Sequence, residues 1–587
     1  MSVRKNCREG EKGINKNHNS EQHGTVEWWK KAVFYQIYPR SFQDSNNDGI
    51  GDLPGIISRL DYLNDGTPAS LGVDAIWLSP FFTGPEHDFG YDIADYCSVD
   101  PRFGTIADFD CLIVEAHRRN IKVILDLVVN HTSHLHPWFQ ESRSSRSNPR
   151  RDWYIWRDGK GKNRKPPNNW RNNFFGSAWT FDEKSGQYYL HSFLKEQPDL
   201  NWRNPKVRKA VEEIMCFWLE HGADGFRLDV PHIYCKDQYF RDNPPFFRRE
   251  KIKTGPRLLD RLFMSNVMKL LSLPELQVRK YNQHQPETHE VLRMLRTVLD
   301  HYPGTTSVGE IIADDPALIA SYYGENNDEL HMNFYFELLH CRWKAGAFRR
   351  SINRWEKVLP RGAWPAYALS NHDVVRAASR YGGGLKGKKR ARLLAMLLLT
   401  LRGTPFLYYG EEVAMQEVKL PKGKIKDPIG QWWYPLNRGR DGCRTPMQWN
   451  GEANAGFSPA EPWLPVGPDF SLLNVAEQDK DPRSHLNFIK RLLQMRKSFP
   501  ALQTGDYESL DFGSSENVFS FRRQAGEEKL LICLNFSSCR QEIQLLQRNN
   551  QYRLLLSTGL NGRPEGSSFQ PFLFPHEGII IEEHPGV

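Results

Sequence analysis

Residues 225–230 read GFRLDV, and they place Arg227 and Asp229 two positions apart inside an otherwise apolar run. Alternate side chains of a β-strand share one face, so both charged groups would lie on the same side of the strand. Burying a charge costs several kcal/mol unless the group is paired or put to use. The pattern therefore predicts either a structural ion pair or a site that uses both charges.

Polar residues close three other apolar runs of the chain. They are Asp126, Asn130 and His131 in the first, Glu310 in the second, and Asn371, His372 and Asp373 in the last. In a barrel of parallel strands the carboxyl ends of the strands form one face, and active sites of this architecture lie there. We therefore expect the carboxylates of Asp229, Glu310 and Asp373 to face one pocket.

Three carboxylates that face one pocket repel one another, so their proton affinities separate. One of them can stay ionised beside Arg227, while a less solvated one can hold its proton near neutral pH. An ionised nucleophile and a protonated acid are the groups that retaining glycoside hydrolysis needs. The third carboxylate can hold sugar hydroxyl groups and help to distort the ring.

Eight short apolar runs predict the strands that would position these groups. The runs are 33–38, 75–79, 122–128, 225–230, 306–311, 330–336, 366–370 and 405–410. Between them, stretches such as 106–120 and 206–222 carry apolar residues at i, i+3, i+4 and i+7, which predicts helices. This alternation predicts an α/β fold, a (β/α)₈ or TIM barrel.

Two interruptions and a change of pattern predict the domain organisation. We expect the catalytic barrel at 27–130 and 201–499, an inserted subdomain at 131–200 after the third strand, and a second excursion at about 411–475. Short strands after residue 500 predict a C-terminal antiparallel β-domain, a β-sandwich, at 500–587. Residues 1–26 are polar, are expected to be a disordered tail, and lack the apolar core of a secretory signal.

Composition narrows the cellular context. The 587 residues include 39% hydrophobic and 25% charged residues, typical of a globular protein, and no apolar run reaches the roughly 20 residues of a membrane span. Nine cysteines without CxxC spacing favour reduced thiols and a cytoplasmic location. The net charge is +8, and many of the basic residues lie in segments that resemble solvated loops. We expect no membrane or nucleic-acid partner, no organic cofactor, and a monomer or homodimer.

Four ordered segments carry a family resemblance. The segments DLVVNH (126–131), GFRLDV (225–230), VGEI (308–311) and SNHDVVR (370–376) resemble the four signature regions of the α-amylase family, glycoside hydrolase family 13. The resemblance implies Asp229 as nucleophile, Glu310 as acid/base and Asp373 as transition-state stabiliser. It also implies that the first sugar ring is contacted by His131, Arg227 and His372.

Further segments are similar to one branch of that family, the exo-acting α-glucosidases and oligo-1,6-glucosidases. They are 33–56, FGYDIADY (89–96), QPDLNWRNP (197–205) and DGCRTPMQW (441–449). In this branch Asp92 and Arg376 would pair at the pocket floor and hold the 4-hydroxyl of a terminal glucose, so that only a chain end could enter. The physical alternative for Asp92 is a helix or turn cap.

Other residues near these motifs are candidates for contacts with the sugar. Tyr91 is a candidate stacking platform, and Phe174 or Phe175 could wall the sugar site or belong to the core. Val230 follows the expected nucleophile, and in this branch valine there tends to accompany α-1,6 preference. A methyl group or two gives only about 1–3 kcal/mol of discrimination. The following PHIY differs from the IN or VN common in the branch, so the linkage stays open.

The segment DSNNDGIGD (44–52) places oxygen-bearing side chains at alternating positions around glycines. Hard oxygen ligands on a tight turn suit Ca²⁺, although the bidentate glutamate of an EF-hand is replaced by Gly55. The family branch has a calcium loop here, in which Ile50 contributes its carbonyl. The expected ligands of a structural Ca²⁺ are therefore Asp44, Asn46, Asp48, Ile50 and Asp52. The alternative is a loop that is held by its own hydrogen bonds.

Taken together, the motifs predict a retaining exo-α-glucosidase that removes terminal α-1,4- or α-1,6-linked glucose from short oligosaccharides. A transglucosylase or isomerase, such as a sucrose isomerase or a trehalose synthase, would share the double displacement and differ in what intercepts the glucosyl-enzyme. A more remote alternative is a non-catalytic ancillary subunit of a transporter. Such subunits need a transmembrane segment and usually lack the full set of three carboxylates.

Overall fold

The computed structural model describes residues 27–161, 165–174, 176–245, 277–511, 516–543, 551–559, 566 and 570–584. The expected tail at 1–26 and Phe175 lie outside these described residues.

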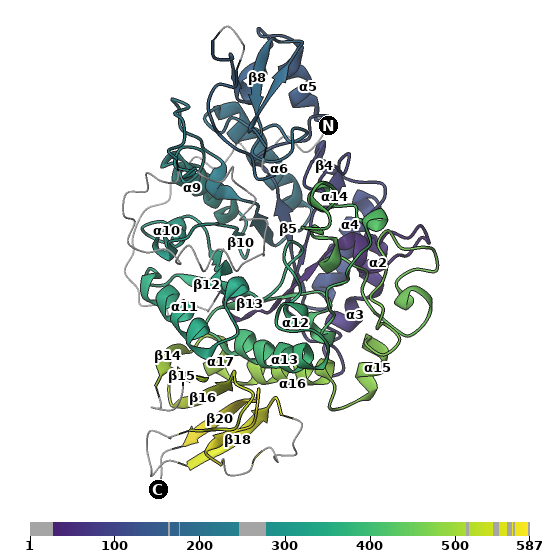
Figure 1. The fold of residues 1–587 in the computed structure, drawn as a ribbon, viewed down its shortest axis with the longest axis vertical. Helices are drawn as coiled ribbons and strands as arrows, with labels where there is room; N and C mark the ends of the chain where they lie inside the picture. Colours follow the sequence, from purple (N-terminus) through teal and green to yellow (C-terminus); the bar gives the residue numbers. More distant parts are fainter. Residues whose placement is uncertain are drawn as a thin grey trace.

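Eight parallel strands close into a barrel in the order β1-β13-β12-β11-β10-β9-β5-β2 (Figure 1). Their bounds are β1 Phe34–Ile37, β2 Ala75–Leu78, β5 Lys122–Leu127, β9 Gly225–Leu228, β10 Thr306–Gly309, β11 Met332–Phe334, β12 Trp364–Ala368 and β13 Thr404–Tyr408. Each of the eight apolar runs thus forms one barrel strand, and the predicted (β/α)₈ fold is confirmed.

Helices cover the outside of the barrel. The longer ones are α4 Ile106–Arg118, α6 Pro205–Glu220, α9 Glu287–Asp300, α11 Ala345–Val358, α13 Gly384–Thr400 and α16 His485–Ser498. Helix α4 begins at a capping box, in which Thr105 and Asp108 satisfy each other's backbone N–H groups. Helix α6 begins at Asn204, whose side chain accepts from the N–H of Lys206. These signals place the helix starts where the sequence pattern changes from polar to amphipathic.

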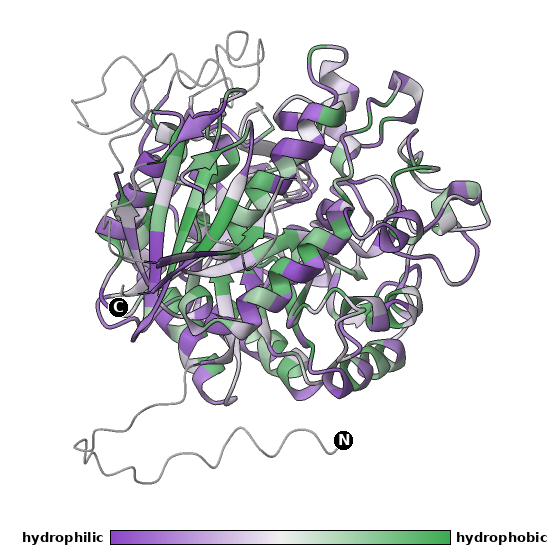
Figure 2. Ribbon diagram, turned by 90° about the horizontal axis from the view of Figure 1, so that it is seen from below, coloured by the Kyte–Doolittle hydropathy of each residue, from purple (hydrophilic) through white to green (hydrophobic). Residues whose placement is uncertain are grey.

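The barrel interior is filled by its own apolar cluster, which includes Phe34, Trp77, Ile124, Val308 and Phe406. Figure 2 views the molecule from its C-terminal end and shows hydrophobic residues gathered along the strands in front. Because side chains alternate along a strand, the inward position of Ile124 also turns Asp126 inward. The same alternation of side chains therefore places apolar residues in the centre of the barrel and charged groups at its carboxyl end.

Two smaller units extend from the barrel. Between β5 and α6 lies a three-stranded sheet of β6 (Trp156–Arg157), β8 (Gln187–Leu190) and β7 (Trp179–Asp182), at the top of Figure 1. At the opposite end is the predicted C-terminal antiparallel domain. Its five-stranded sheet follows the order β14-β15-β16-β20-β18, with bounds Asp506–Leu510, Val518–Ala525, Glu528–Asn535, Gly578–His584 and Gln551–Ser557.

Within the described part of the chain, none of the helices is long and apolar enough to cross a membrane.

Candidate active site

The buried guanidinium group of Arg227 joins three carboxyl groups at the mouth of the barrel. Its Nη1 lies 2.6 Å from Oδ1 of Asp126 and 2.7 Å from Oδ1 of Asp229, and its Nη2 is hydrogen-bonded to Glu310. Only 2% of the Arg227 surface is exposed. Arg227 and Asp229 therefore form an ion pair, and the same guanidinium group also binds Asp126 and Glu310.

Strand register explains this convergence. Asp126 on β5 lies directly beside Arg227 on β9 in the parallel ladder, so both side chains point to the barrel interior. Asp229 follows β9 and keeps the same inward direction two residues later. Glu310 follows β10, the other neighbour of β9, in the same way. Three adjacent strands thus deliver one arginine and three acids to one space.

The pKa values of Asp229 and Glu310, the expected nucleophile and acid, are raised. Burial raises the pKa of Asp229 to about 7 against the opposing charge of Arg227. Burial raises that of Glu310 to about 8, again against Arg227, and the charges of Asp229 and Asp373 raise it further. Glu310 keeps its proton to the higher pH, which is the order that an acid beside an ionised nucleophile requires.

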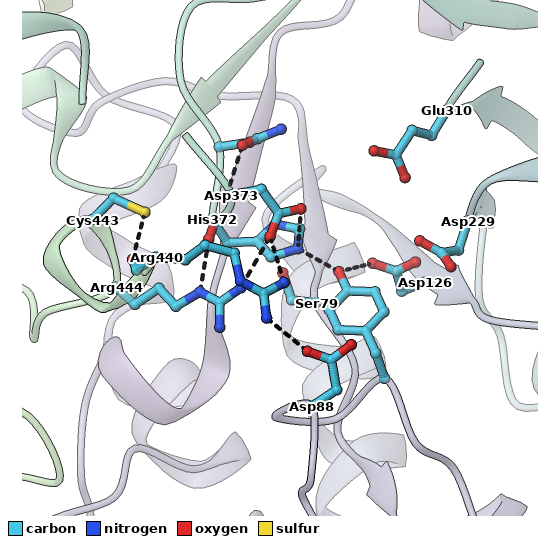
Figure 3. Close-up of polar contacts among 12 residues, drawn as sticks. Ser79, Asp88, Asp126, Asp229, Glu310, His372, Asp373, Arg440, Cys443 and Arg444 are labelled. Carbon is cyan, nitrogen blue, oxygen red and sulfur yellow. Dashed lines mark hydrogen bonds and ion pairs between the residues drawn. The ribbon is translucent and has the colours of Figure 1, made fainter. Parts of the chain in front are cut away.

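Asp373 lies in the opposite electrostatic setting. Burial by itself would raise its pKa, but electrostatic interactions with His372, Arg440 and Arg444 outweigh burial and hold the pKa well below its usual value. Nη2 of Arg444 lies 3.0 Å from Oδ1 of Asp373, and Nη1 of Arg440 lies 3.2 Å from the same atom. The side chain is 33% exposed, so this carboxylate stays ionised at the open side of the site. Figure 3 shows the carboxyl groups of Asp229, Glu310 and Asp373 around one space, with the two arginines behind Asp373.

Tyr91 and His372 form a hydrogen-bonded chain that ends at Asp126. The Nδ1 atom of His372 lies 2.8 Å from Nε2 of Gln36, which donates, so the ring proton sits on Nε2. That Nε2 lies 2.7 Å from the Tyr91 hydroxyl, which donates to Asp126 at 3.0 Å. The two rings also stack, with centroids 5.3 Å apart and planes at 6°. Tyr91 and His372, which are both predicted to contact the sugar, are therefore held in place beside the carboxyl groups of the site.

His131 lies behind Tyr91 and is fully buried. Its Nε2 is 2.9 Å from the Tyr91 carbonyl, and its Nδ1 is 3.1 Å from Nδ2 of Asn130. Both ring nitrogens thus contact protein groups. In this structure His131 supports the position of Tyr91, and its predicted role as a sugar contact stays a prediction.

The expected pair between Asp92 and Arg376 is wrong. Asp92 accepts hydrogen bonds from the backbone N–H groups of His87 and Asp88, at 2.7 and 3.1 Å, and burial raises its pKa to about 8. Arg376 instead donates to the Tyr409 carbonyl at 2.7 Å. Asp92 is thus a turn cap, the alternative that its sequence context left open. The N–H groups of its own turn are close to Asp92 in the chain, whereas Arg376 is remote in the chain. The carboxylate therefore bonds the turn and not the arginine.

An arginine that the sequence analysis missed, Arg440, lies on the Asp373 side of the site. Its Nη2 lies 2.7 Å from Oδ1 of Asp88 and 2.9 Å from Oδ1 of Asp427, while its Nη1 reaches Asp373. Asp88 is presented by the turn that Asp92 caps. Arg440 directly precedes the recognised segment 441–449, and that adjacency was the available signal. No local pattern links it to Asp88, which is 352 positions away in the chain.

Two further candidates take defined positions. Phe174 is buried, and its ring lies 5.9 Å from the guanidinium carbon of Arg440 and 6.1 Å from the ring of Trp432. Its role as a wall of the sugar site stays a prediction. Val230 has the left-handed backbone conformation, with φ 38° and ψ 47°. This conformation is costly for a β-branched residue and marks a turn that the surroundings hold in place.

The loop expected to bind calcium is held by its own hydrogen bonds. The Asp44 carboxylate accepts from the N–H groups of Asn46, Asn47 and Gly49 and from the Ser458 hydroxyl. Asp52 caps helix α2, Leu53–Ser58, by accepting from Gly55. Among the described residues, no group of three or more His, Cys, Asp or Glu side chains is placed to hold a metal ion. The calcium ligands stay a prediction: Asp44, Asn46, Asp48, Ile50 and Asp52.

Comparisons with known proteins find relatives that match most of the chain. A family model described as the α-amylase catalytic domain matches residues 36–505. The chain is 45% identical over 515 residues to the "Probable alpha-glucosidase" of Rhizobium meliloti (strain 1021), covering 87% of this chain and 90% of that protein. It is 41% identical over 541 residues to the oligo-1,6-glucosidase of Parageobacillus thermoglucosidasius, covering 87% and 90%. A solved structure of an "alpha-glucosyl transfer enzyme, XgtA" superposes with a TM-score of 0.86 at 41% identity, covering 95% of this chain and 100% of that one.

Proposed function

Since this chain belongs to the α-amylase family of glycoside hydrolases, family 13, we propose that it is a retaining, exo-acting α-glucosidase. It would remove the terminal non-reducing glucose from short α-linked oligosaccharides. The observation that carries the proposal is the sharing of one buried guanidinium group, that of Arg227, by Asp126, Asp229 and Glu310, with Asp373 at the open side.

In the proposed reaction Glu310 protonates the glycosidic oxygen while Asp229 attacks the anomeric carbon. The bond to the leaving sugar breaks, and a covalent glucosyl-enzyme forms on Asp229. Glu310, now ionised, takes a proton from water, which attacks the same carbon and releases glucose. Arg227 keeps Asp229 ionised and oriented, and the carboxylate of Asp373 holds sugar hydroxyl groups as positive charge develops on the ring.

The exo-acting part of the proposal rests on the side of the site that Arg440 closes. The ion pairs from Arg440 to Asp88, Asp373 and Asp427 tie three loops together beside Asp373. A wall of this kind ends the space available to a sugar chain, so only a chain end would enter. Charged oxygen and nitrogen atoms at that end suit the hydroxyl groups of a terminal glucose.

Transfer of glucose to a sugar or alcohol acceptor is a second candidate. It is favoured by the likeness to the glucosyl transfer enzyme, because hydrolysis and transfer share the glucosyl-enzyme and differ only in what attacks it. The groups around Asp229 do not distinguish water from another hydroxyl compound.

A time-resolved product panel from maltose, isomaltose, sucrose, trehalose, kojibiose, nigerose and starch tests the proposal. We expect glucose from maltose or isomaltose, released first as the α-anomer, and slow release from starch. Transfer products that appear before glucose would support the transglucosylase instead. Efficient cleavage in the middle of starch chains would contradict the exo-acting proposal.

A further inference from the structure

Both backbone groups of Glu310 are bonded to the segment that carries Asp229. The Glu310 N–H donates to the Leu228 carbonyl at 3.1 Å, and the Glu310 carbonyl lies 3.2 Å from Nδ1 of His232. Leu228 and His232 flank Asp229 on either side. The short stretch from 228 to 232 therefore holds the peptide unit of Glu310 as well as the carboxyl group of Asp229.

Glu310 needs such support because it lies just beyond the barrel ladder. Strand β10 ends at Gly309, and its pairing with β11 covers only Val308 with Met332 and Gly309 with Asn333. The Glu310 carbonyl thus has no strand neighbour on that side. A buried carbonyl without a hydrogen-bond partner costs free energy, and a loose peptide would let the carboxyl group move.

The bond to His232 has a definite direction. A carbonyl oxygen only accepts, so Nδ1 of His232 carries the ring proton and donates it. Burial holds the pKa of His232 well below its usual value, so the ring stays neutral and keeps a single N–H. The donor is therefore present over the whole pH range in which the two acids titrate.

The ring of His232 is fixed from a second side. It is 4% exposed and packs against the ring of His284, with centroids 5.1 Å apart. The His284 N–H donates to the His232 carbonyl at 2.7 Å, and Nδ1 of His284 is 2.9 Å from the Tyr322 hydroxyl. The turn before it contains Val230 in the left-handed conformation. The turn at Val230 and the segment around His284 thus together determine the direction in which Nδ1 of His232 points.

We propose that His232 is a positioning residue for Glu310: its Nδ1–H holds the Glu310 peptide so that the carboxyl group stays within reach of the glycosidic oxygen. The proposal rests on the proposed α-glucosidase function. Without this bond the carboxyl group would shift while Asp229 kept Arg227 and its own place. A displacement of about 1 Å can lower a rate about 10²-fold.

This role has a signature that general weakening of the structure lacks. Loss of a well-placed acid affects kcat/KM only when the leaving group needs a proton to depart. Maltose has such a leaving group. 4-Nitrophenyl α-glucoside does not, because nitrophenolate leaves without a proton. A positioning defect therefore separates the two substrates, whereas partial unfolding lowers kcat/KM equally for both.

The test compares His232→Asn with His232→Gln. Asparagine can place its amide N–H where Nδ1 lies, while glutamine places its amide near the former Nε2 and leaves the Glu310 carbonyl without a donor. We expect His232→Gln to lower kcat/KM for maltose about 10²-fold and for the nitrophenyl substrate less than about tenfold. His232→Asn should stay within about tenfold of the wild type on both substrates. His289→Asn is the matched control, since that histidine contacts Tyr322 and Glu329 and not Glu310.

Equal activities of the Asn and Gln variants, or equal losses on the two substrates, would overturn the proposal. Thermal unfolding of each variant checks its folding. If the Gln variant does not fold, His232→Ala takes its place with the same expected separation of the two substrates. A wild-type enzyme that hydrolyses neither substrate would contradict the proposed function itself, which is a different outcome from a positioning failure.

Discussion

Arg227 and Arg523 are both almost completely buried, and their charges have opposite surroundings. At the barrel mouth, Arg227 is surrounded by carboxyl groups. At the junction with the C-terminal domain, Arg523 of β15 is 0% exposed and donates to backbone carbonyls, among them those of Thr400 at 2.6 Å and Gly505 at 2.9 Å. Thr400 ends α13, so this arginine links the domain to the barrel.

The pKa shifts of the two arginines differ in sign. Burial alone lowers an arginine pKa, and at Arg523 it dominates, so the pKa lies well below its usual value. At Arg227 burial is outweighed by the charges of Asp126 and Glu310, and the pKa is raised. Carbonyl groups satisfy the donors and fasten two elements together. At the barrel mouth the pKa values of the carboxyl groups are shifted as well. Carboxyl groups with shifted pKa values can exchange protons with a substrate.

The strongest test of this comparison removes the proposed nucleophile. Asp229→Asn keeps the size of the side chain and its contact with Arg227 but cannot form the glucosyl-enzyme. We expect kcat to fall at least about 10⁴-fold while the circular dichroism spectrum and unfolding temperature stay close to those of the wild type. Turnover within tenfold of the wild type would exclude Asp229 as the nucleophile.

Removing the arginine at the barrel mouth should lower activity strongly. Arg227→Met leaves its carboxyl groups without a counter-charge, so the pKa of Asp229 should rise further. We expect kcat/KM to fall about 10³-fold and the acidic limb of its pH profile to move to higher pH. A pH-rate profile of the variant measures both effects, and an unmoved acidic limb would argue against the ion pair as the source of the shift.

Removing the junction arginine should lower stability and leave activity unchanged. Arg523→Met removes a buried group that donates to several carbonyls, so we expect the free energy of unfolding to fall by about 2–4 kcal/mol. Because this residue lies far from the carboxyl cluster in the chain and in the fold, kcat/KM of the folded variant should match that of the wild type. Denaturant unfolding and steady-state kinetics on one preparation compare the two, and a large loss of kcat/KM would break the distinction between the regions.

A smaller effect concerns stability against pH. Glutamate in an unfolded chain has a pKa of about 4.3, and burial raises that of Glu310 to about 8. The folded state then binds the proton more tightly, so the contribution of Glu310 to stability falls as the pH rises between these values. Glu310→Gln has no proton to lose. We expect the unfolding temperature of the variant minus that of the wild type to increase from about pH 5 to about pH 8 and to stay constant above that. A constant difference would contradict the raised pKa.

The smallest effect is expected at the loop 44–52, where carboxylates hold backbone N–H groups instead of an arginine. If the predicted Ca²⁺ binds there, millimolar Ca²⁺ should raise the unfolding temperature of the wild type, and Asp48→Ala should remove the rise. Asp48 lies at the loop surface, where its Oδ1 accepts from the Ile50 N–H at 2.8 Å. No difference between Ca²⁺ and a chelator in the wild type would reject the calcium site.

The sequence predicted the barrel well because its strands are short, apolar and separated by amphipathic helices, a pattern that local residues alone decide. It also predicted which acids reach the mouth, since Asp229 and Glu310 directly follow their strands. It failed at the Asp92–Arg376 pair. Whether a buried aspartate caps a turn or meets an arginine depends on loops that are remote in the chain, such as the one that brings Arg440 to Asp88.

The most direct test of the account is to trap the glucosyl-enzyme. The wild type is incubated with 5-fluoro-α-glucosyl fluoride, which slows hydrolysis of the covalent intermediate, and peptides are then mapped by mass spectrometry. The account predicts one fluoroglucosyl group per chain on the peptide that contains Asp229, and none in Asp229→Asn. A label on another acidic residue, or turnover of the reagent without any label on the wild type, would contradict it.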